Sequence, residues 1–508
     1  MLGKRRLKIM DFRDFFDRKT KIQFSILLFL IEKGAPVRKD ELKEVGNISS
    51  FILEHSLEEL TDLMSEMQMK MKILYQEETN TYSIKKYSQA ELETLYYYFV
   101  KRSLFYKLIL YLYHNSRYTI PILCQELCIS EATVYRNIVH ANQLLEEFGL
   151  VIKNGKIHGD DLQLCHFFFQ FFWNSFSLSE LEQLVSDYEI LCFTDLLEKK
   201  LSMKMTRTTK IRICLWCRML KVNALRKNQL SKTVFNLLEV FRLDPMFQRV
   251  KECYFLSLSY SAIFGTDYTA ACIYLFLSAS FPYAMQVRYE LNEKGWPTYL
   301  DDVIQINEMV LKKIHTVFST ANTEPIKSHD FYSLYLLSQT HTAILYLKGK
   351  IIDYNSEFFF KHLPQNSIEI ANHPFIETIV QCVEKDIEKK LDHTDRLYLS
   401  WVYSYVAMQV IQNNHEPISI GVHLSKTPLL TVIYIDQLKQ IYGSLGNILI
   451  DIASVSNHYD ILIADDTLST YDFSFDQFFC IQDITQTSQY SLQEILNANK
   501  RKETPCES

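Results

Sequence analysis

Four polar side chains recur on one side of a short helical segment in the first third of the chain. Thr133, Arg136, Asn137 and His140 all follow the turn Cys128-Ile129-Ser130. Arginine can hydrogen-bond guanine and asparagine can pair with adenine, and side chains of these four types can reach base edges or phosphates. We therefore expect these four side chains to contact nucleic acid.

The apolar residues around this segment predict the helices that would hold these four side chains in place. Leu123 and Leu127 belong to a short helix before the turn, and Ser130 suits an N-cap because its hydroxyl can accept an unpaired amide hydrogen. Further apolar residues recur at steps of four and three and so share one buried face: Val134, Ile138, Ala141, Leu145 and Phe148. The pattern predicts a helix-turn-helix whose second helix, Glu131 to Glu147, enters the major groove.

A hairpin is predicted directly after that helix, which Gly149 can end. Asn154 and Gly155 lie between short alternating runs, and Asn-Gly is a strong signal for a two-residue hairpin loop. Lys153 and Lys156 flank this tip, where they can meet phosphate. A helical hairpin that never touches DNA is the plainer interpretation. Binding of double-stranded DNA is favoured over it because the turn, the cap, the polar face and the wing agree.

A second helix-turn-helix is predicted upstream. An apolar helix, Ile22 to Ile31, and a short second helix, Pro36 to Val45, precede a third helix that Ser49 or Ser50 would cap. Lys72 to Gln76 can pair with Thr81 to Lys85 as a wing. The third helix carries apolar residues at heptad-like spacing and turns Glu54, Glu58, Glu59 and His55 outward. Because phosphate repels carboxylates, this domain is either an accessory DNA contact or purely structural.

Length and composition predict a multidomain protein with well-formed cores. The 508 residues allow three to five domains, and 48% are hydrophobic against 22% charged. A net charge of −6 argues against a general polyanion binder, so a nucleic-acid contact must come from a local patch. The start of the chain, with Lys4, Arg5, Arg6 and Lys8, lacks the apolar run of a signal peptide, and no run is long enough to span a bilayer. With scattered cysteines, this predicts a cytoplasmic protein without a membrane partner.

The rest of the chain changes character twice. From Asp161 to Asn414 the periodicity is helical, beginning with the aromatic segment His166 to Trp173, which we expect to form a buried helix. Two blocks of similar size are interpreted as copies of one helical domain. After Pro417, short apolar strands around the helix Pro428 to Tyr442 predict a small α/β domain with a parallel sheet. The expected fold is therefore mainly α and multidomain.

Motifs for catalysis are missing. Cys214-Leu215-Trp216-Cys217 lies in an apolar helical pattern, so two core cysteines are favoured over a zinc or redox site. The sequence contains no GxGxxG, Walker, HExxH or GxSxG motif. We therefore predict no catalytic residues, no metal site, no cofactor and no enzymatic activity.

Taken together, the chain resembles the Mga/AtxA family of virulence transcriptional regulators in Gram-positive bacteria, and it is most similar to the RofA-like members. The resemblance is sharpest in LCQELCISEATVYRNIVHANQLLEEFGLVI, while KIQFSILLFLIEKGAPVRKDELKEVGNISSFILEHSLEEL resembles the family's upstream winged domain. It implies five domains: an N-terminal winged helix domain (1–87), a Mga-type helix-turn-helix domain (88–162), two helical domains like the phosphotransferase-system regulation domain, or PRD (163–286 and 287–414), and an EIIB-like α/β domain (415–508).

The resemblance also implies regulation. In such proteins the phosphocarrier protein HPr phosphorylates histidines of the PRD, and the EIIB-like domain mediates homodimerisation. His341 falls in a position similar to the first histidine of the regulatory domain and is the phosphorylation candidate. The helix Ala270 to Ala279 instead has phenylalanine or leucine where related domains carry a histidine, and the loop His423 to Thr427 lacks the phosphoacceptor cysteine of EIIB proteins.

The combined prediction is a DNA-binding transcriptional regulator of virulence or metabolic genes, modulated by the phosphotransferase system and by dimerisation. Two alternatives stay open. One is an interaction scaffold that senses phosphotransferase proteins without binding DNA, which the acidic net charge supports. The other is an RNA-binding antiterminator with similar sensor domains, although such proteins typically begin with a small β-rich domain.

Overall fold

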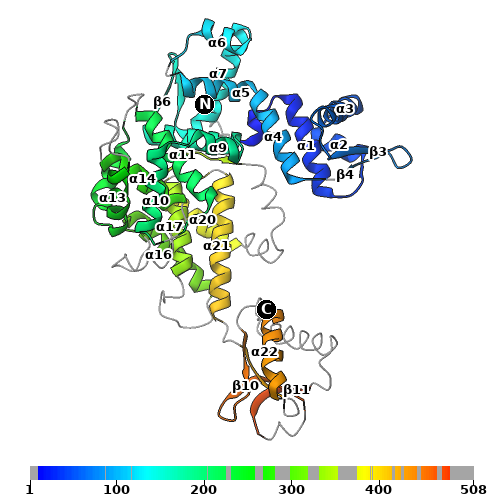
Figure 1. Ribbon diagram of the computed structural model, residues 1–508, viewed down its shortest axis with the longest axis vertical. Helices are drawn as coiled ribbons and strands as arrows, with labels where there is room; N and C mark the ends of the chain where they lie inside the picture. Colours follow the sequence, from blue (N-terminus) through cyan, green and yellow to red (C-terminus); the bar gives the residue numbers. More distant parts are fainter. Residues whose placement is uncertain are drawn as a thin grey trace. The chain divides into compact units, whose positions relative to one another are not determined.

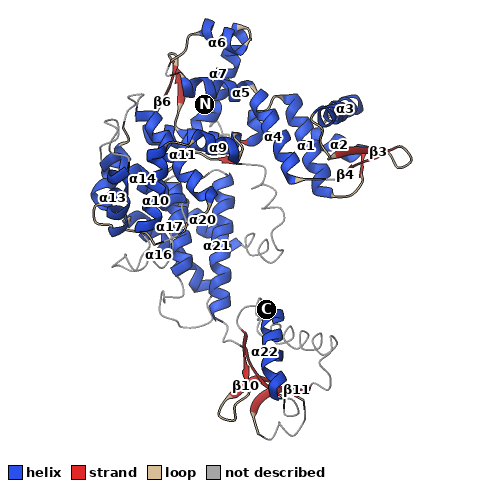
Figure 2. Ribbon diagram, in the orientation of Figure 1, coloured by secondary structure: helices blue, strands red, loops and turns tan. Residues whose placement is uncertain are grey.

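The computed structural model describes residues 10–85, 87–115, 117–202, 204–224, 230–257, 267–280, 298–318, 331–352, 374–388, 391, 393–414, 418–424, 428–442, 448–465 and 472–480. The predicted basic cluster at residues 4–8 lies outside them, as do residues 425–427. Helices dominate, so the predicted mainly α, multidomain class is confirmed (Figure 1, Figure 2). The chain divides into two compact units: Met1–Val310 with Ile326–Val402, and Leu311–Pro325 with Tyr403–Ser508.

The first winged helix has the predicted elements. Helices α1 (Arg18–Lys33), α2 (Lys39–Gly46) and α3 (Ser50–Glu66) enclose an aliphatic core. Strands β2 (Val37–Arg38), β4 (Thr81–Lys85) and β3 (Lys72–Gln76) form an antiparallel sheet in that order, with the predicted wing pairing. Ser49 caps α3, because its hydroxyl accepts a hydrogen bond from the Ile52 amide at 3.4 Å.

The second winged helix follows at once along the chain. It comprises α4 (Gln89–Arg102), α5 (Leu104–His114), α6 (Ile120–Leu127), α7 (Glu131–Leu145), the 3-10 turn η2 (Glu146–Phe148), β5 (Val151–Lys153) and β6 (Lys156–His158). Helix α7 is shorter than the predicted Glu131 to Glu147. Its last turn tightens to 3-10 geometry and ends at Gly149 with φ +68°, a conformation that glycine adopts without a Cβ clash.

Helix α8 (Asp161–Ser175) leads into the first helical block. The block continues with α9 (Leu178–Leu184), α10 (Tyr188–Lys200), α11 (Arg207–Ala224), α12 (Lys232–Phe241), α13 (Pro245–Ser257) and α14 (Asp267–Ser280). Thirteen of the 15 residues of α8 are buried, so this helix is enclosed on all sides and the predicted buried aromatic helix is confirmed.

The aromatic rings of α8 connect two regions of the chain. Phe171 packs against Phe15 of the N-terminal 3-10 turn η1 (Phe12–Phe15), with ring centroids 5.9 Å apart. Phe167 packs on Phe148, at the end of the second helix-turn-helix, at 5.1 Å. Phe169 instead packs on Phe276 of α14 at 4.9 Å. The DNA-binding candidate and the first helical block therefore share one continuous core.

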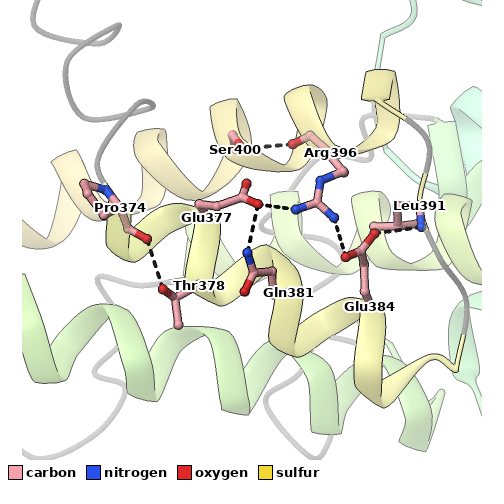
Figure 3. A network of polar contacts seen from close by, with 8 residues as sticks. All are labelled: Pro374, Glu377, Thr378, Gln381, Glu384, Leu391, Arg396 and Ser400. Atoms are coloured by element: carbon pink, nitrogen blue, oxygen red, sulfur yellow. Dashed lines mark hydrogen bonds and ion pairs between the residues drawn. The ribbon is translucent and has the colours of Figure 1, made fainter.

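The second helical block contains α16 (Asp301–Phe318), α17 (Phe331–Tyr346), α20 (Pro374–Asp386) and α21 (His393–Asn414). Arg396 of α21 reaches across to Glu377 and Glu384 of α20, and the Glu384 carboxylate also accepts from the Leu391 amide at 2.9 Å (Figure 3). This network joins the two helices to each other and to Leu391. Whether the two blocks are copies of one domain stays a prediction, as do the predicted domain boundaries.

A short piece of chain after α17 returns to the helix-turn-helix domain. We call residues 347–352 the return segment. Its strand β7 (Ile351–Ile352) pairs in parallel with β1 (Met10–Asp11). The Lys350 amide donates to a carboxylate oxygen of Glu147 at 3.0 Å, and the ring of Phe148 lies so close that a Cβ on Gly349 would come within 2.6 Å of it.

The second unit contains the predicted α/β domain. Strands β8 (Ile418–His423), β9 (Ile448–Ile452), β10 (His458–Ala464) and β11 (Ser474–Cys480) form a parallel sheet in the order β11-β10-β8-β9. Helix α22 (Pro428–Tyr442) contributes Tyr434, Ile435 and Leu438 to the core on this sheet. The two middle strands, β8 and β10, are the most deeply buried, as their apolar runs predict.

Two glycines in the left-handed region provide a test of how closely the return segment packs on Phe148. Gly34 has φ +60° with no heavy atom within 4 Å of an added Cβ, so Gly34→Ala introduces only backbone strain of about 1–2 kcal/mol. Gly349 has φ +76° and faces the Phe148 ring, so Gly349→Ala should lower Tm further in calorimetry. Equal effects of the two substitutions would contradict close packing on Phe148.

Candidate nucleic-acid interface

Local capping fixes the start of the second helix. The Ser130 hydroxyl accepts from the Thr133 amide at 3.4 Å, so the predicted N-cap is present. Cys128 makes the turn in the left-handed region, with φ +54°. The buried residues of α7 are Val134, Ala141, Leu144 and Leu145, and Ile138 is half-buried. The predicted apolar face therefore lies on the core and leaves the other side of α7 outward.

Three of the four predicted contact residues lie together near the start of α7. Arg136 is exposed, and its guanidinium donates to the Thr133 hydroxyl at 3.1 Å. The Asn137 side-chain amide is half-buried and donates to the Thr133 carbonyl at 2.8 Å. Arg136 is thus the side chain with the freest access to a groove, and Thr133 orients it.

His140 is placed differently from the other three. Its Nε2 lies 3.4 Å from the Asp14 carbonyl oxygen, and its ring meets Phe105 edge-on with centroids 6.2 Å apart. The imidazole therefore faces the protein, where it links α7 to the N-terminal turn. This inward orientation does not support the predicted groove contact of His140.

Sequence reasoning missed two exposed residues on the same helix. The side chains of Tyr135 and Val139 are 52% and 58% exposed, although their types are usually more buried. With Glu131, Ala132 and Arg136 they form one outward strip, which we call the α7 strip. Apolar side chains can contact the thymine methyl group, so the strip offers both hydrogen bonds and apolar contacts. The helical spacing of these residues is the signal that could have found them.

The wing is a tight hairpin fixed to its surroundings. Residues 151–153 pair antiparallel with 156–158, and Asn154 and Gly155 occupy the turn with φ +51° and +78°. The Tyr118 amide donates to the Gly155 carbonyl at 2.8 Å. Lys153 is exposed and Lys156 half-buried. The predicted hairpin is therefore present, while the predicted phosphate contacts of its lysines stay a prediction.

Asn142 ties the wing to α7. Its side-chain oxygen accepts from the Ile152 amide at 2.6 Å, and its side-chain nitrogen donates to the Ile152 carbonyl at 3.1 Å. One side chain thereby satisfies both backbone groups of a buried strand residue. The wing and the α7 strip are held as one rigid surface.

The upstream helix α3 presents a different surface. Glu54 pairs with Lys39, and the Glu59 carboxylate accepts from the Gln23 side-chain nitrogen at 2.8 Å and contacts Lys19. These partners reduce the negative charge that would face a phosphate. Phe51, however, is 77% exposed at the start of α3. The two predicted roles of this domain, accessory contact or structural support, both remain open.

The phosphorylation candidate His341 lies inside the second helical block. The side chain is 1% exposed, and its Nδ1 donates to the Asn307 side-chain oxygen at 2.6 Å. Asn307 in turn donates to the Ser338 hydroxyl at 2.8 Å. Burial lowers the pKa of His341 to about 3, so the imidazole is neutral. Phosphorylation by another protein would require the imidazole first to become exposed.

The remaining chemistry of the described residues is limited. Cys214 and Cys217 are buried in α11 as core residues, and burial raises the pKa of Cys214 to about 12. No group of three or more His, Cys, Asp or Glu side chains in the described ranges could hold a metal ion. In the same ranges, no helix combines the length and apolarity needed to cross a bilayer.

Breaking the Asn142 link should loosen the wing. Asn142→Ala leaves the Ile152 amide and carbonyl without these partners, at a cost of about 1–3 kcal/mol for a buried unsatisfied group. We expect a lower Tm and faster hydrogen exchange at the Ile152 amide. Gln143→Ala, at the neighbouring exposed position, is the matched control. Unchanged exchange in Asn142→Ala would show that the hairpin holds without it.

The buried histidines should make stability depend on pH. The pKa of His341 is lowered to about 3 and that of His166 to about 4, both mainly by burial. An unfolded histidine has a pKa of about 6.5, so between this value and the folded pKa the unfolded chain binds more protons. Stability should therefore fall as the pH drops through this window, by up to about 1.4 kcal/mol per pH unit for each histidine.

Denaturant unfolding at several pH values checks this dependence. His341→Gln should flatten the slope below pH ~6.5, because one titrating group is removed. His55→Gln changes an exposed histidine of α3 and serves as the control. An identical slope in the wild type and in His341→Gln would mean that His341 is not held neutral.

Comparison with known proteins bears on the region just described. Residues 88–172 match the family model for the Mga helix-turn-helix domain, and this match ends within α8. A curated protein of Streptococcus pneumoniae serotype 4, named "Putative trans-acting regulator", is 22% identical over 186 residues. That alignment covers 34% of this chain and 36% of the relative, so the chain matches about a third of that protein's length. These matches confirm the predicted resemblance to Mga-family regulators.

Proposed function

We propose that this chain, whose residues 88–172 match the Mga helix-turn-helix domain, is a transcriptional regulator that reads double-stranded DNA with α7. The observation that supports this most directly is the exposed α7 strip beside a wing that is fixed to the same helix. Arg136 would donate to a guanine edge, with Thr133 orienting it and Asn137 supporting the same turn. Lys153 and Lys156 would contact phosphate on the flank.

Electrostatics restrict where DNA can bind. The chain carries a net charge of −6, so its overall charge does not attract a polyanion. We therefore expect DNA to contact a local group of cations, and Arg136, Lys153 and Lys156 lie on α7 and the wing. Because each neutralised phosphate releases condensed counterions, binding should weaken as the salt concentration rises, and more steeply the more phosphates the protein contacts.

The finer parts of the proposal rest on the family resemblance. The regulator would act in the cytoplasm as a homodimer, since a two-fold protein matches two half-sites on DNA. HPr would report sugar supply to the PRD-like blocks, the target genes would serve virulence or metabolism, and the chain would have no enzymatic activity. The EIIB-like assignment is compatible with the parallel sheet of the second unit.

The scaffold alternative is favoured by one observation. The exposed Phe51 and Ile52 at the start of α3 are apolar groups next to carboxylates, a surface better suited to protein than to DNA. An RNA-binding antiterminator finds no comparable support in the described residues. Protein binding at α3 is compatible with DNA reading by α7, so the DNA titration below separates a regulator from a scaffold.

The proposal is tested by titrating DNA from upstream of the protein's own gene and its neighbours at two salt concentrations. Wild-type protein should bind with a steep salt dependence, and Arg136→Ala should lose about 1–3 kcal/mol because one base-edge contact is removed. Arg207→Ala removes an exposed arginine from α11 and is the matched control. If the wild type binds and Arg136→Ala is silent, another face reads the DNA. If the wild type binds at neither salt, the scaffold alternative replaces the proposal.

A further inference from the structure

A cavity of about 330 Å³ lies where the two helical blocks meet the return segment. Its wall combines α8, α11, the end of α14, α17, the return segment and α21, and it lies wholly within the first compact unit. Ligand pockets in proteins usually measure about 300–1,000 Å³, so this cavity suits a molecule of metabolite size.

The unusual group in the wall is Arg212 of α11. Its guanidinium lies over the ring of Trp173 at 5.1 Å and over that of Phe169 at 5.9 Å. Among the described residues, no carboxylate pairs with it. Burial lowers the pKa of Arg212, and no neighbouring charge offsets that effect. A largely desolvated cation with only aromatic faces for support is costly unless an anion can reach it.

A second cation faces the same cavity from the return segment. The Lys350 ammonium lies 4.3 Å from the centroid of the Tyr398 ring, and its charge contributes to the lowered pKa of His166 in the wall. Among the described residues of the wall, Asp395 is the acidic one, and His166 is neutral. With Arg212 and Lys350 against Asp395, these described residues carry one net positive charge. This charge favours an anion over a cation or a neutral sugar.

We propose that this cavity binds a small organic anion, a carboxylate or a phosphate ester, with Arg212 as its principal contact. The planar guanidinium can donate two parallel hydrogen bonds to such a group, which neither a bulky apolar ligand nor a cation can use. Lys350 adds a second positive charge from the return segment. Gln170 and Thr340, also in the wall, supply polar groups for the remainder of the ligand.

Lys350 connects the cavity to the DNA-binding candidate α7, so that ligand binding can act on that helix. The side chain of Lys350 lines the cavity, while its backbone amide donates to Glu147 directly after α7. Its neighbour Gly349 packs against Phe148 and accepts a hydrogen bond from His166 at 3.0 Å. An anion that draws Lys350 inward would therefore shift the residues at the end of α7. This regulatory part rests on the proposed function, whereas the binding site does not.

The binding site is tested by calorimetric titration of the full chain with three probes: inorganic phosphate, glycerol 3-phosphate and citrate, at constant ionic strength set with chloride. At least one should bind the wild type and raise its Tm. Arg212→Gln should weaken that binding about tenfold or more, as expected for loss of a charge-assisted hydrogen bond. Arg207→Gln removes the same charge from the exposed start of the same helix and should bind as the wild type does.

Two further variants keep the test decisive. Arg212→Lys retains the charge without the planar fork and should bind the probe at an intermediate strength. If Arg212→Gln does not fold, Lys350→Gln takes its place in the test and should also weaken binding of the probe. The proposal is overturned if none of the three probes binds the wild type. It is equally overturned if a probe binds folded Arg212→Gln as tightly as the wild type, since the anion would then lie elsewhere.

The regulatory part is measured separately by repeating the DNA titration with the bound probe at saturation. A change in DNA affinity that disappears in Lys350→Gln supports coupling through the return segment. An unchanged affinity removes the coupling and leaves the binding site standing. Absence of DNA binding under all conditions counts against the proposed function and not against the cavity, because calorimetry does not involve DNA.

Discussion

The aromatic surface of α8 is the constraint on which the first compact unit depends. A helix buried on every side must be covered from every direction, and here different parts of the chain supply the cover. Phe15 and Phe148 approach one side, while Phe276 and Trp216 approach Phe169 from another. Such rings bury large apolar areas and prefer edge or offset contacts, so they fix orientation as well as stability.

The core that the second winged helix shares with the first helical block restricts how α7 and the wing can move. The second winged helix cannot move far from the first helical block without exposing these rings to water. Its recognition helix is positioned by the Asn142 link to the wing on one side and by the return segment on the other. A displacement among the helical blocks therefore has a short physical path to α7. Where the elements meet, small displacements have large effects because packed interiors resist gradual deformation.

Local chemistry explains which parts of this arrangement the sequence could predict. Ser130 at the N-cap and Asn154-Gly155 at the hairpin act through their own backbone, and both occur as expected. The partner of His140 lies 126 residues away, so its inward orientation depends on tertiary packing that no local pattern records. Tyr135 and Val139 were recoverable from helical spacing, although their apolar types argued for burial. The cavity around Arg212 was not recoverable, because several separate elements form its wall.

The pairing of β1 with β7 delays one step of folding during synthesis. Met10 and Asp11 leave the ribosome before both winged helices and the first helical block, whereas their partners Ile351 and Ile352 follow after them. At about 5–20 residues per second, the completed second winged helix waits roughly 10–40 s for the return segment. During that interval the end of α7 lacks its Gly349 and Lys350 contacts. A nascent chain therefore presents the second winged helix before the return segment that packs against it has been made. Ribosome pausing upstream of residue 347 would prolong that state.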